Sequence, residues 1–383
     1  MFNSKYNIWF KDYVCKNKSF FRNKKNLNLT IIIFTFQRPE CIIKSAAYWA
    51  NRPLKVIIID GSTQILNKSF RKTLKKIRNI SYYHLPNKSI SERIKFGSNK
   101  SKTKFTMCQG DDDFYLFSGL IESVKKFKKN SSIVASMGQS VGLDYMNNKP
   151  YLFEYGENLK GYNIINRNVV RRLDYAFKNY IPAAFYAVFK TKVFKRLWKN
   201  IKTSSCLELY EYEHALKTYL EGSLITTKKK YWVRSFQQKP QISKIDGNRK
   251  LTFSEWLSNK KFSPEKKILI RHLSNAIQKK TILKKQESKE LVCRIFDLIR
   301  FNKNSLYQNN SRFLSIVICF KKLIEISFFS KCLKKFKNSN YGIILIQKLN
   351  YLSRKKIMFS KQIDRVQEAE IKKLLEFLNN CPI

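Results

Sequence analysis

Three consecutive aspartates, Asp111, Asp112 and Asp113, are the residues of this sequence best suited to chemistry. They follow residues 104–110 (K-F-T-M-C-Q-G), which are expected to form a short buried strand ending in a turn glycine, and they precede residues 114–120, which lead into an amphipathic helix. Adjacent carboxylates repel one another, and a divalent cation is the simplest partner that neutralises them. At the end of a buried strand they also stand where open α/β sheets bind ligands. The alternative is a solvated acidic turn that caps the next helix.

Two other polar loops follow buried strands in the same way. Residues 35–39 (Thr-Phe-Gln-Arg-Pro) come directly after the first expected strand, and residues 60–62 (Asp-Gly-Ser) come after the second. The carboxyl ends of parallel strands meet at one edge of a sheet, so these loops and the aspartates are expected to share a crevice. Such a crevice suits a nucleoside diphosphate, with a carboxylate for the base or ribose and a cation and an arginine for the phosphates.

The elements that position these loops alternate between strand and helix from residue 29, which predicts an α/β fold with a mostly parallel sheet. Strands are expected at residues 30–35, 54–59, 80–84, 104–110 and 132–136, with helices at 39–50, 66–77, 89–100 and 118–129. Residues 140–180 are expected to be rich in loops. Further strands are expected at 151–155, 183–189 and 224–234, and further helices at 193–198 and 207–221.

The pattern changes near residue 241, where strand signals end. Helical periodicity then recurs near residues 264–280, 286–301, 311–336 and 361–379, with lysines throughout. The sequence therefore predicts a basic N-terminal extension at 1–28, an α/β domain at 29–240, and a basic all-helical region at 241–383.

The composition is that of a folded protein, with 43% hydrophobic and 14% aromatic residues among 383. The net charge of +49 comes mainly from lysines dispersed along the chain. Dispersed lysine favours a solvated basic surface, with attraction to an anionic membrane or another polyanion as the alternative. Eight cysteines without a CxxC pair indicate a reduced, cytoplasmic setting, and three scattered histidines disfavour a histidine-based zinc site.

Membrane attachment is expected to be peripheral at most. The first thirty residues lack the apolar core of a signal peptide, and residues 313–320 are too few to span a bilayer. Residues 321–329 mix lysine with Phe, Ile and Leu, which is typical of a membrane-surface helix and equally of an ordinary packing helix. We therefore expect a cytoplasmic protein; the alternative is peripheral attachment to the inner face of the cytoplasmic membrane.

Residues 29–235 resemble the family 2 type of glycosyltransferase with a GT-A fold. The resemblance rests on residues 30–39 (T-I-I-I-F-T-F-Q-R-P), on residues 56–62 (V-I-I-I-D-G-S), and on residues 109–114 (Q-G-D-D-D-F), which look like the family's DXD region. It implies a GT-A, Rossmann-like domain that transfers a sugar from a nucleotide-diphosphate donor. The expected cofactor is Mg²⁺ or Mn²⁺, and the expected acceptor is a glycan or lipid-linked molecule of cell-surface polysaccharide synthesis.

The resemblance also implies roles for single residues. Asp111 and Asp113 match the metal-binding DXD pair, and Asp112 is left open between the ribose and the metal. A cation there stabilises the negative charge that develops on the departing nucleoside diphosphate.

By position in the same resemblance, Asp60 would contact the nucleoside, with Thr35 and Arg38 beside the diphosphate. Arg93 and Lys95 precede the fourth strand; a solvated helix face is the preferred interpretation for both, and phosphate contact is the alternative.

Inverting members of the fold use a carboxylate to deprotonate the acceptor hydroxyl, usually from a helix after the metal-binding half. Residues 207–221 offer Glu208, Glu211 and Glu213. Glu211 is the first candidate and Glu213 the second, against the ordinary alternative of a glutamate paired with a lysine such as Lys217. The family's Glu-Asp dipeptide is missing here, which leaves the base and the stereochemistry open.

Three rival functions remain. A basic nucleic-acid-binding protein is disfavoured because the lysines are dispersed and no binding module is recognisable. A phosphotransferase using residues 59–63 would need a second aspartate where Ser62 stands. A non-catalytic scaffold protein on a glycosyltransferase-like fold is the third alternative.

Overall fold

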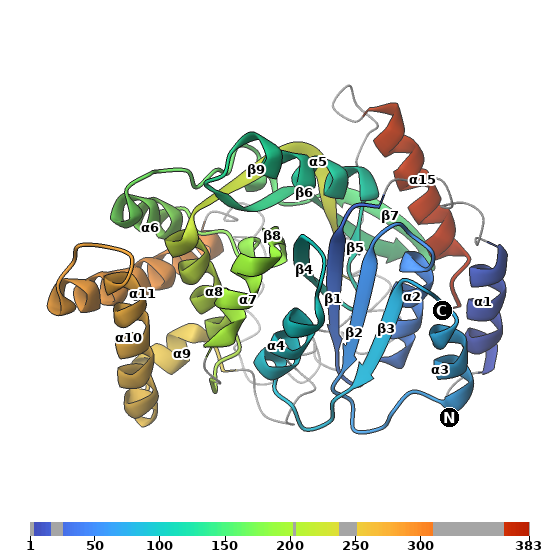
Figure 1. Cartoon of the computed structure of the whole chain (residues 1–383), viewed down its shortest axis with the longest axis horizontal. Helices are drawn as coiled ribbons and strands as arrows, with labels where there is room; N and C mark the ends of the chain where they lie inside the picture. Colours follow the sequence, from blue (N-terminus) through green and yellow to red (C-terminus); the bar gives the residue numbers. More distant parts are fainter. Residues whose placement is uncertain (1–3, 17–25, 202–203, 237–250, 309–363, 383) are drawn as a thin grey trace, which may run out of the picture.

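The computed structural model describes residues 4–16, 26–201, 204–236, 251–308 and 364–382. Within these ranges one mixed sheet has the strand order β3-β2-β1-β4-β8-β6-β9-β5, with β7 paired to β6 (Figure 1). The strands are β1 (Leu29–Thr35), β2 (Lys55–Asp60), β3 (Ile80–His84), β4 (Phe105–Gly110), β5 (Phe114–Tyr115), β6 (Ile133–Met146), β7 (Lys149–Glu154), β8 (Val188–Lys190) and β9 (Ser223–Ser235). The predicted α/β class, with helices after the sheet, is confirmed.

Helices cover the sheet and continue beyond it. They are α1 (Ser4–Lys16), α2 (Pro39–Trp49), α3 (Lys68–Lys75), α4 (Ile90–Lys100), α5 (Phe117–Lys129), α6 (Val169–Lys178), α7 (Thr191–Lys199), α8 (Glu208–Glu221), α9 (Phe253–Ser258), α10 (Ser263–Gln278), α11 (Lys285–Gln308) and α15 (Arg365–Asn379).

The first four strands are parallel and bring their loops to one edge, as the alternation predicts. Strand β1 lies between β2 and β4, with Thr35 in register with Asp60 and Phe34 in register with Gly110. Every residue of β1 is buried, as expected for a strand covered on both faces. Helix α4 lies close to this sheet because Gly97 has no side chain. An added Cβ there would lie 2.6 Å from Ile59 Cδ1.

The second half of the domain differs from the sequence prediction in several elements. The strand predicted at 183–189 is confirmed only at residues 188–189, which belong to the short strand β8; a 3₁₀ turn, Ala184–Tyr186, precedes it. A buried apolar run has no periodicity that separates a strand from a packed turn, which explains the error. Strand β6 is far longer than the predicted 132–136, because it pairs with β7, β8 and β9 in turn. Helix α6 falls inside the segment expected to be loops.

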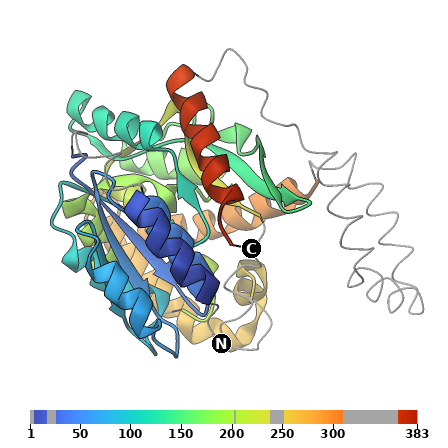
Figure 2. The ribbon, with the colours of Figure 1, turned by 90° about the vertical axis from the view of Figure 1, so that its right-hand side faces the viewer.

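The C-terminal helices pack in two places. Helices α9, α10 and α11 lie beside α6 and α8, at the left in Figure 1. Helix α15 instead packs on α5 and β7, next to α1, as Figure 2 also shows. Its Glu370 accepts hydrogen bonds from the backbone N–H groups of Phe117 and Ser118 and from the Ser118 hydroxyl at 2.6 Å. A carboxylate thus caps the start of α5, where an anion is favoured.

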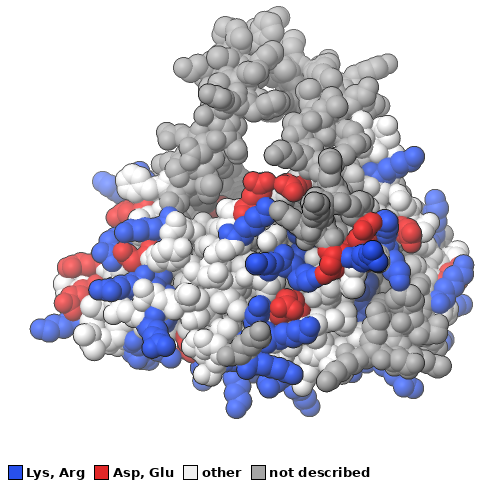
Figure 3. Space-filling view, turned by 90° about the horizontal axis from the view of Figure 1, so that it is seen from above, with Lys and Arg blue, Asp and Glu red and all other residues white. Residues whose placement is uncertain are grey.

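Basic side chains are distributed over the face seen in Figure 3, with acidic side chains among them. This agrees with dispersed rather than clustered lysine. Within the described ranges, none of the helices combines the length and apolar character needed to cross a bilayer. Residues 311–336, including the lysine-rich stretch 321–329, lie outside the described residues.

Candidate functional site

A cleft of about 340 Å³ opens at the carboxyl ends of β1 and β4. One wall holds the three aspartates and Arg38. A second is the start of α8, with Glu208 and Glu211. A third is the end of β9, and Tyr186 closes the space between them. The structure therefore brings the aspartates, the arginine loop and one predicted base together.

Asp111 is held by side chains of the β1 loop. Arg38 donates from Nε to Asp111 Oδ2 at 3.2 Å, and a second guanidinium nitrogen pairs with Asp111 Oδ1. The Thr35 hydroxyl donates to Oδ2 at 2.5 Å. Burial raises the pKa of Asp111 to about 6, although the charge of Arg38 acts to lower it. The cation in contact with this fully buried carboxylate in the structure is thus Arg38.

Asp113 is also buried but has neutral partners. The Trp232 indole N–H donates to its Oδ2 at 3.0 Å, and the Ser235 backbone N–H donates to its Oδ1 at 3.1 Å. Burial, and next the charge of Asp112, raise the pKa of Asp113 to about 8. The site therefore holds a carboxyl group for which added positive charge would be favourable.

Asp112 is the most exposed of the three, with 20% of its side chain accessible, and Arg38 donates to its Oδ2 at 3.0 Å. Its Oδ1 and Asp113 Oδ2 border one spot beside Gly110. A Cβ added to that glycine would lie 3.3 Å from the first oxygen and 3.2 Å from the second. Two carboxylate oxygens therefore converge where a small residue leaves room.

This pair suits a hard divalent cation that is shared with a ligand. Mg²⁺ is commonly held by one or two carboxylates together with substrate phosphates, rather than by an all-protein cage. In the described part of the chain no three His, Cys, Asp or Glu residues are arranged to hold a metal alone. The two oxygens beside Gly110 belong to Asp112 and Asp113. The metal pair implied by the sequence resemblance, Asp111 with Asp113, stays a prediction.

Asp60 lies behind the cleft and does not line it. Its side chain is fully buried, with Oδ1 accepting from the Ser62 backbone N–H at 2.9 Å and Oδ2 accepting from the Tyr82 hydroxyl at 2.7 Å. These bonds hold the β2 loop. Asp60, predicted to contact the nucleoside, has no face toward the cleft in this arrangement.

Arg93 is buried, contrary to the solvated helix face expected for it. It donates to the Thr35 carbonyl and lies over Gly61, where an added Cβ would approach its guanidinium to 2.5 Å. Burial lowers the pKa of Arg93, while Asp60 and Asp111 act to raise it. Arg93 thus joins the β1 and β2 loops and is not among the residues that line the cleft.

The two glutamates proposed as bases point in different directions. Residues two apart on a helix are separated by about 200° around its axis. Accordingly Glu211 lines the cleft. Glu213 is 3% exposed and pairs with Lys217 at 2.5 Å and with His272 at 3.1 Å, on another side of α8. Glu208 lines the cleft but also accepts from the Phe253 backbone N–H at 2.9 Å, joining α8 to α9.

The β9 wall contains functional candidates that the sequence reasoning missed. Trp232 stacks on Tyr186 with ring centroids 4.7 Å apart. The Arg234 guanidinium carbon lies 5.6 Å from the Trp232 ring and 5.4 Å from the Tyr155 ring. Pairing of Phe114 with Val233 brings this strand end beside the aspartates. Residues 231–234 had been expected to form a strand, but no local signal specifies that pairing.

Comparisons with known proteins give a limited result. No protein-family model and no curated protein matches this chain. Among solved structures, S. aureus TarS residues 1–349 gives a TM-score of 0.42 at 10% identity, covering 73% of this chain and 91% of that one. The same fragment in complex with UDP-GlcNAc also gives 0.42, at 12% identity, covering 73% and 92%.

The mannosyltransferase PcManGT from Pyrobaculum calidifontis, in complex with GDP-Man and Mn²⁺, gives a TM-score of 0.40 at 11% identity, covering 91% of this chain and 96% of that one. At TM-scores below 0.5 none of them carries an argument for this chain, and its function has to be inferred from its own residues.

Proposed function

We propose that this protein is a glycosyltransferase that moves a sugar from a nucleotide-diphosphate donor to a glycan or lipid-linked acceptor, with Mg²⁺ or Mn²⁺ as cofactor. The observation that carries the proposal is the composition of one cleft. Asp112 and Asp113 stand on one wall and Glu211 on another, with Arg38 and Arg234 beside them. These groups are of the types needed for a metal–diphosphate site and for a base.

Asp112 and Asp113 would hold the cation, which supplies positive charge to the diphosphate as it leaves. Arg38 acts from behind by fixing Asp111, and with it the loop that carries the other two aspartates. Arg234 is the cation on the opposite wall, and the stacked rings of Tyr186 and Trp232 give a flat apolar surface for a sugar or base.

Glu211 would act as the general base. It takes the proton of the acceptor hydroxyl while that oxygen forms a bond to the anomeric carbon of the sugar. The bond from that carbon to the diphosphate oxygen breaks, and the electron pair leaves with the nucleoside diphosphate. Attack from the side opposite the leaving group inverts the anomeric centre.

The roles of the two regions and the location of the protein are part of the same proposal. The α/β domain at 29–240 would bind the donor, and the basic helical region at 241–383 would bring the acceptor or an anionic membrane surface within reach. A net charge of +49 favours such a surface, and each well-placed Lys or Arg contributes on the order of 1 kcal/mol near an anionic leaflet. A role in cell-surface polysaccharide synthesis at the inner face of the cytoplasmic membrane fits these properties.

The experiment incubates the full-length protein with UDP-, GDP-, CDP- and TDP-sugars, with Mn²⁺ or with EDTA, and measures nucleoside diphosphate release. We expect release from the sugars of one nucleotide and only with the metal. Equal release in EDTA would contradict the cation, and an absence of release from every donor, even with a mixed glycan and lipid acceptor extract, would contradict the activity.

A further inference from the structure

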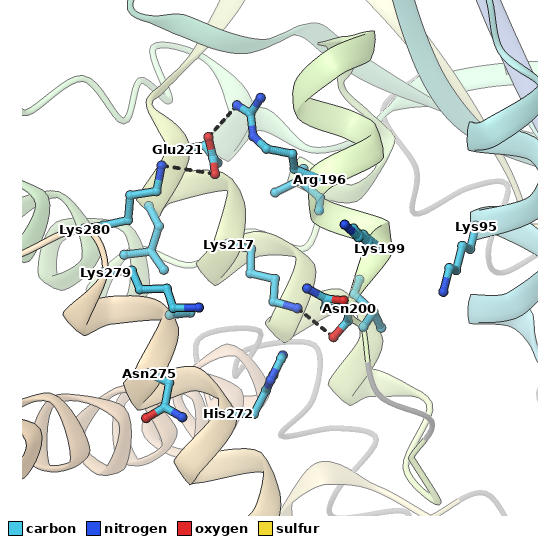
Figure 4. A pocket seen from close by; sticks show the side chains of 14 residues that line it. Lys95, Arg196, Lys199, Asn200, Lys217, Glu221, His272, Asn275, Lys279 and Lys280 are labelled. Carbon is cyan, nitrogen blue, oxygen red and sulfur yellow. Dashed lines mark hydrogen bonds and ion pairs between the residues drawn. The ribbon is translucent and has the colours of Figure 1, made fainter.

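A second cavity, of about 660 Å³, lies outside the aspartate cleft among α7, α8 and α10. Figure 4 shows its labelled side chains, which come from these three helices, from Asn200 just after α7, from Lys279 and Lys280 just after α10, and, in the case of Lys95, from α4. Ligand sites commonly measure about 300–1,000 Å³. The cavity is therefore large enough for a small molecule or for one segment of a larger one.

The lining of this cavity is strongly basic. Its cationic side chains are Lys95, Arg196, Lys199, Lys217, Lys279 and Lys280. The carboxylates in contact with them are Glu221, which lines the cavity, and Glu213, which lies behind Lys217. Six cations against two carboxylates leave an excess of positive charge within one concave surface.

The ion pairs divide these cations into two groups. Glu221 accepts from Arg196 at 2.7 Å and lies 3.3 Å from Lys280 Nζ. Lys217 pairs with Glu213 and also donates to the Asn200 carbonyl at 3.1 Å. Both carboxylates are thus engaged with cations already.

The second group is Lys95, Lys199 and Lys279, for which no carboxylate lies within ion-pair distance among the described residues. In Figure 4 they stand around the same space as Lys217. Like charges gathered on one concave surface repel one another and raise the local concentration of anions. The unpaired ammonium groups are therefore the part of the cavity that a ligand would neutralise.

We propose that this cavity binds a ligand carrying two or more phosphate groups, at a site distinct from the nucleotide cleft. Lysine binds phosphate as a compact point charge with three donors. The amides of Asn200 and Asn275 add neutral hydrogen-bonding groups at the rim. Three unpaired lysines match the charge of a diphosphate better than that of one carboxylate or one phosphate.

The cavity and the cleft share one helix, α8, in their walls. Helix α8 carries Glu211 in the cleft and Lys217 in the cavity, and six residues of helix rise by about 9 Å. A phosphorylated ligand held in the cavity would lie beside the helix that carries the candidate base.

The test titrates inorganic tripolyphosphate calorimetrically into the full-length protein in EDTA, so that no cation assists phosphate binding in the cleft. We expect saturable binding near one equivalent. In K199Q/K279Q the affinity falls roughly tenfold or more, because two charge-assisted contacts are lost. Both lysines are exposed and unpaired, so this variant keeps the fold; circular dichroism checks it.

The matched control is K72Q/K75Q, which removes the same charge from exposed positions on α3 at the other end of the sheet (Figure 1). Its affinity should remain within roughly twofold of wild type, as expected for distant screened charges. Equal losses in the two variants would mean non-specific attraction to a basic surface and would overturn the site. Unchanged binding in K199Q/K279Q would overturn it as well.

Asp113→Asn separates this proposal from the proposed function. We expect it to keep tripolyphosphate binding; if it alone abolishes that binding, the anion binds in the cleft and the cavity is not a site. A second arm uses phosphatidylcholine vesicles with and without cardiolipin, a lipid that carries two phosphates. Vesicle binding that K199Q/K279Q weakens identifies a lipid phosphate as the source, and loss confined to tripolyphosphate identifies a soluble one.

Discussion

The pairing of Arg38 with Asp111 leads to a stability prediction that can be worked from the structure. Arg38 is 3% exposed and the Asp111 side chain 0%, and two guanidinium nitrogens contact the carboxylate. Replacing Arg38 with Met keeps the bulk of the side chain but removes the charge. Asp111 then keeps the Thr35 hydroxyl as a neutral donor but loses the buried cation.

Breaking a buried ion pair by removing one partner typically costs about 3–5 kcal/mol, because the other charge stays buried and uncompensated. We therefore expect R38M to lower the free energy of unfolding by about 3–5 kcal/mol. The double variant R38M/D111N, which removes both charges, should recover most of that loss. Urea denaturation followed by circular dichroism measures all three proteins.

If Asp111 instead binds a divalent cation, as the sequence resemblance implied, the expected result for R38M is different. If a divalent cation neutralised Asp111, then Mn²⁺ would restore the stability of R38M. We expect Mn²⁺ to leave the urea midpoint of R38M unchanged. An R38M protein within about 1 kcal/mol of wild type, or one rescued by Mn²⁺, would refute the view that Arg38 is the partner of Asp111.

Three further predictions concern other helices. E211Q should lower the transfer rate by roughly 10²–10⁴-fold without weakening donor binding. E213Q should instead destabilise the protein and leave the rate per folded molecule near wild type. Steady-state kinetics and thermal melts separate the two results, and an active E211Q enzyme would exclude Glu211 as the base. His214 is fully buried, and burial lowers its pKa from 6.5 to about 3. Between these two pH values the unfolded protein binds a proton at this residue and the folded protein does not, so the free energy of unfolding falls as pH drops from about 6.5 toward 3. H214L should therefore remove about 2 kcal/mol of that loss between pH 7 and pH 5 in urea titrations, and an identical pH dependence in both proteins would contradict the assignment. E370Q should cost about 1–2 kcal/mol by weakening the cap on α5 while nucleotide affinity stays the same, and unchanged thermal stability would show that this contact adds nothing.

The sequence predicts the edge of the sheet well because the information there is local. Residues 31–34 and 56–59 are continuous apolar runs, each followed at once by polar residues. Parallel pairing of the two strands then brings these polar residues to the same edge of the sheet. The arginine loop and the aspartates therefore meet as expected. The prediction of a shared crevice needs no knowledge of side-chain conformations.

Which aspartate pairs with Arg38 and which two lie beside Gly110 could not be predicted in this way. Which carboxylate Arg38 reaches depends on side-chain geometry over a separation of more than seventy residues. The sequence signal is the same for Asp111, Asp112 and Asp113, since all three are adjacent. The preference for Asp112 and Asp113 follows only from burial and from the space beside Gly110.

Long-range pairing explains the other differences. Trp232 and Arg234 reach the cleft because β9 pairs with β5 and β6, strands that are distant in sequence. The orientation of Glu211 and Glu213 depends on the rotation of α8, which is fixed by what it packs against. Lys95 was considered for the phosphates of the donor, and the structure puts it in the wall of the second cavity.

The most direct test of the central claim is a calorimetric titration of UDP, GDP, CDP and TDP into wild-type and D113N protein, with Mn²⁺ and with EDTA. The account predicts that the wild-type protein binds one of these nucleotides in Mn²⁺ only, and that D113N binds none while remaining folded. Equal nucleotide affinity in EDTA, or Mn²⁺-dependent binding that survives in D113N, would contradict a metal–diphosphate site at Asp112 and Asp113.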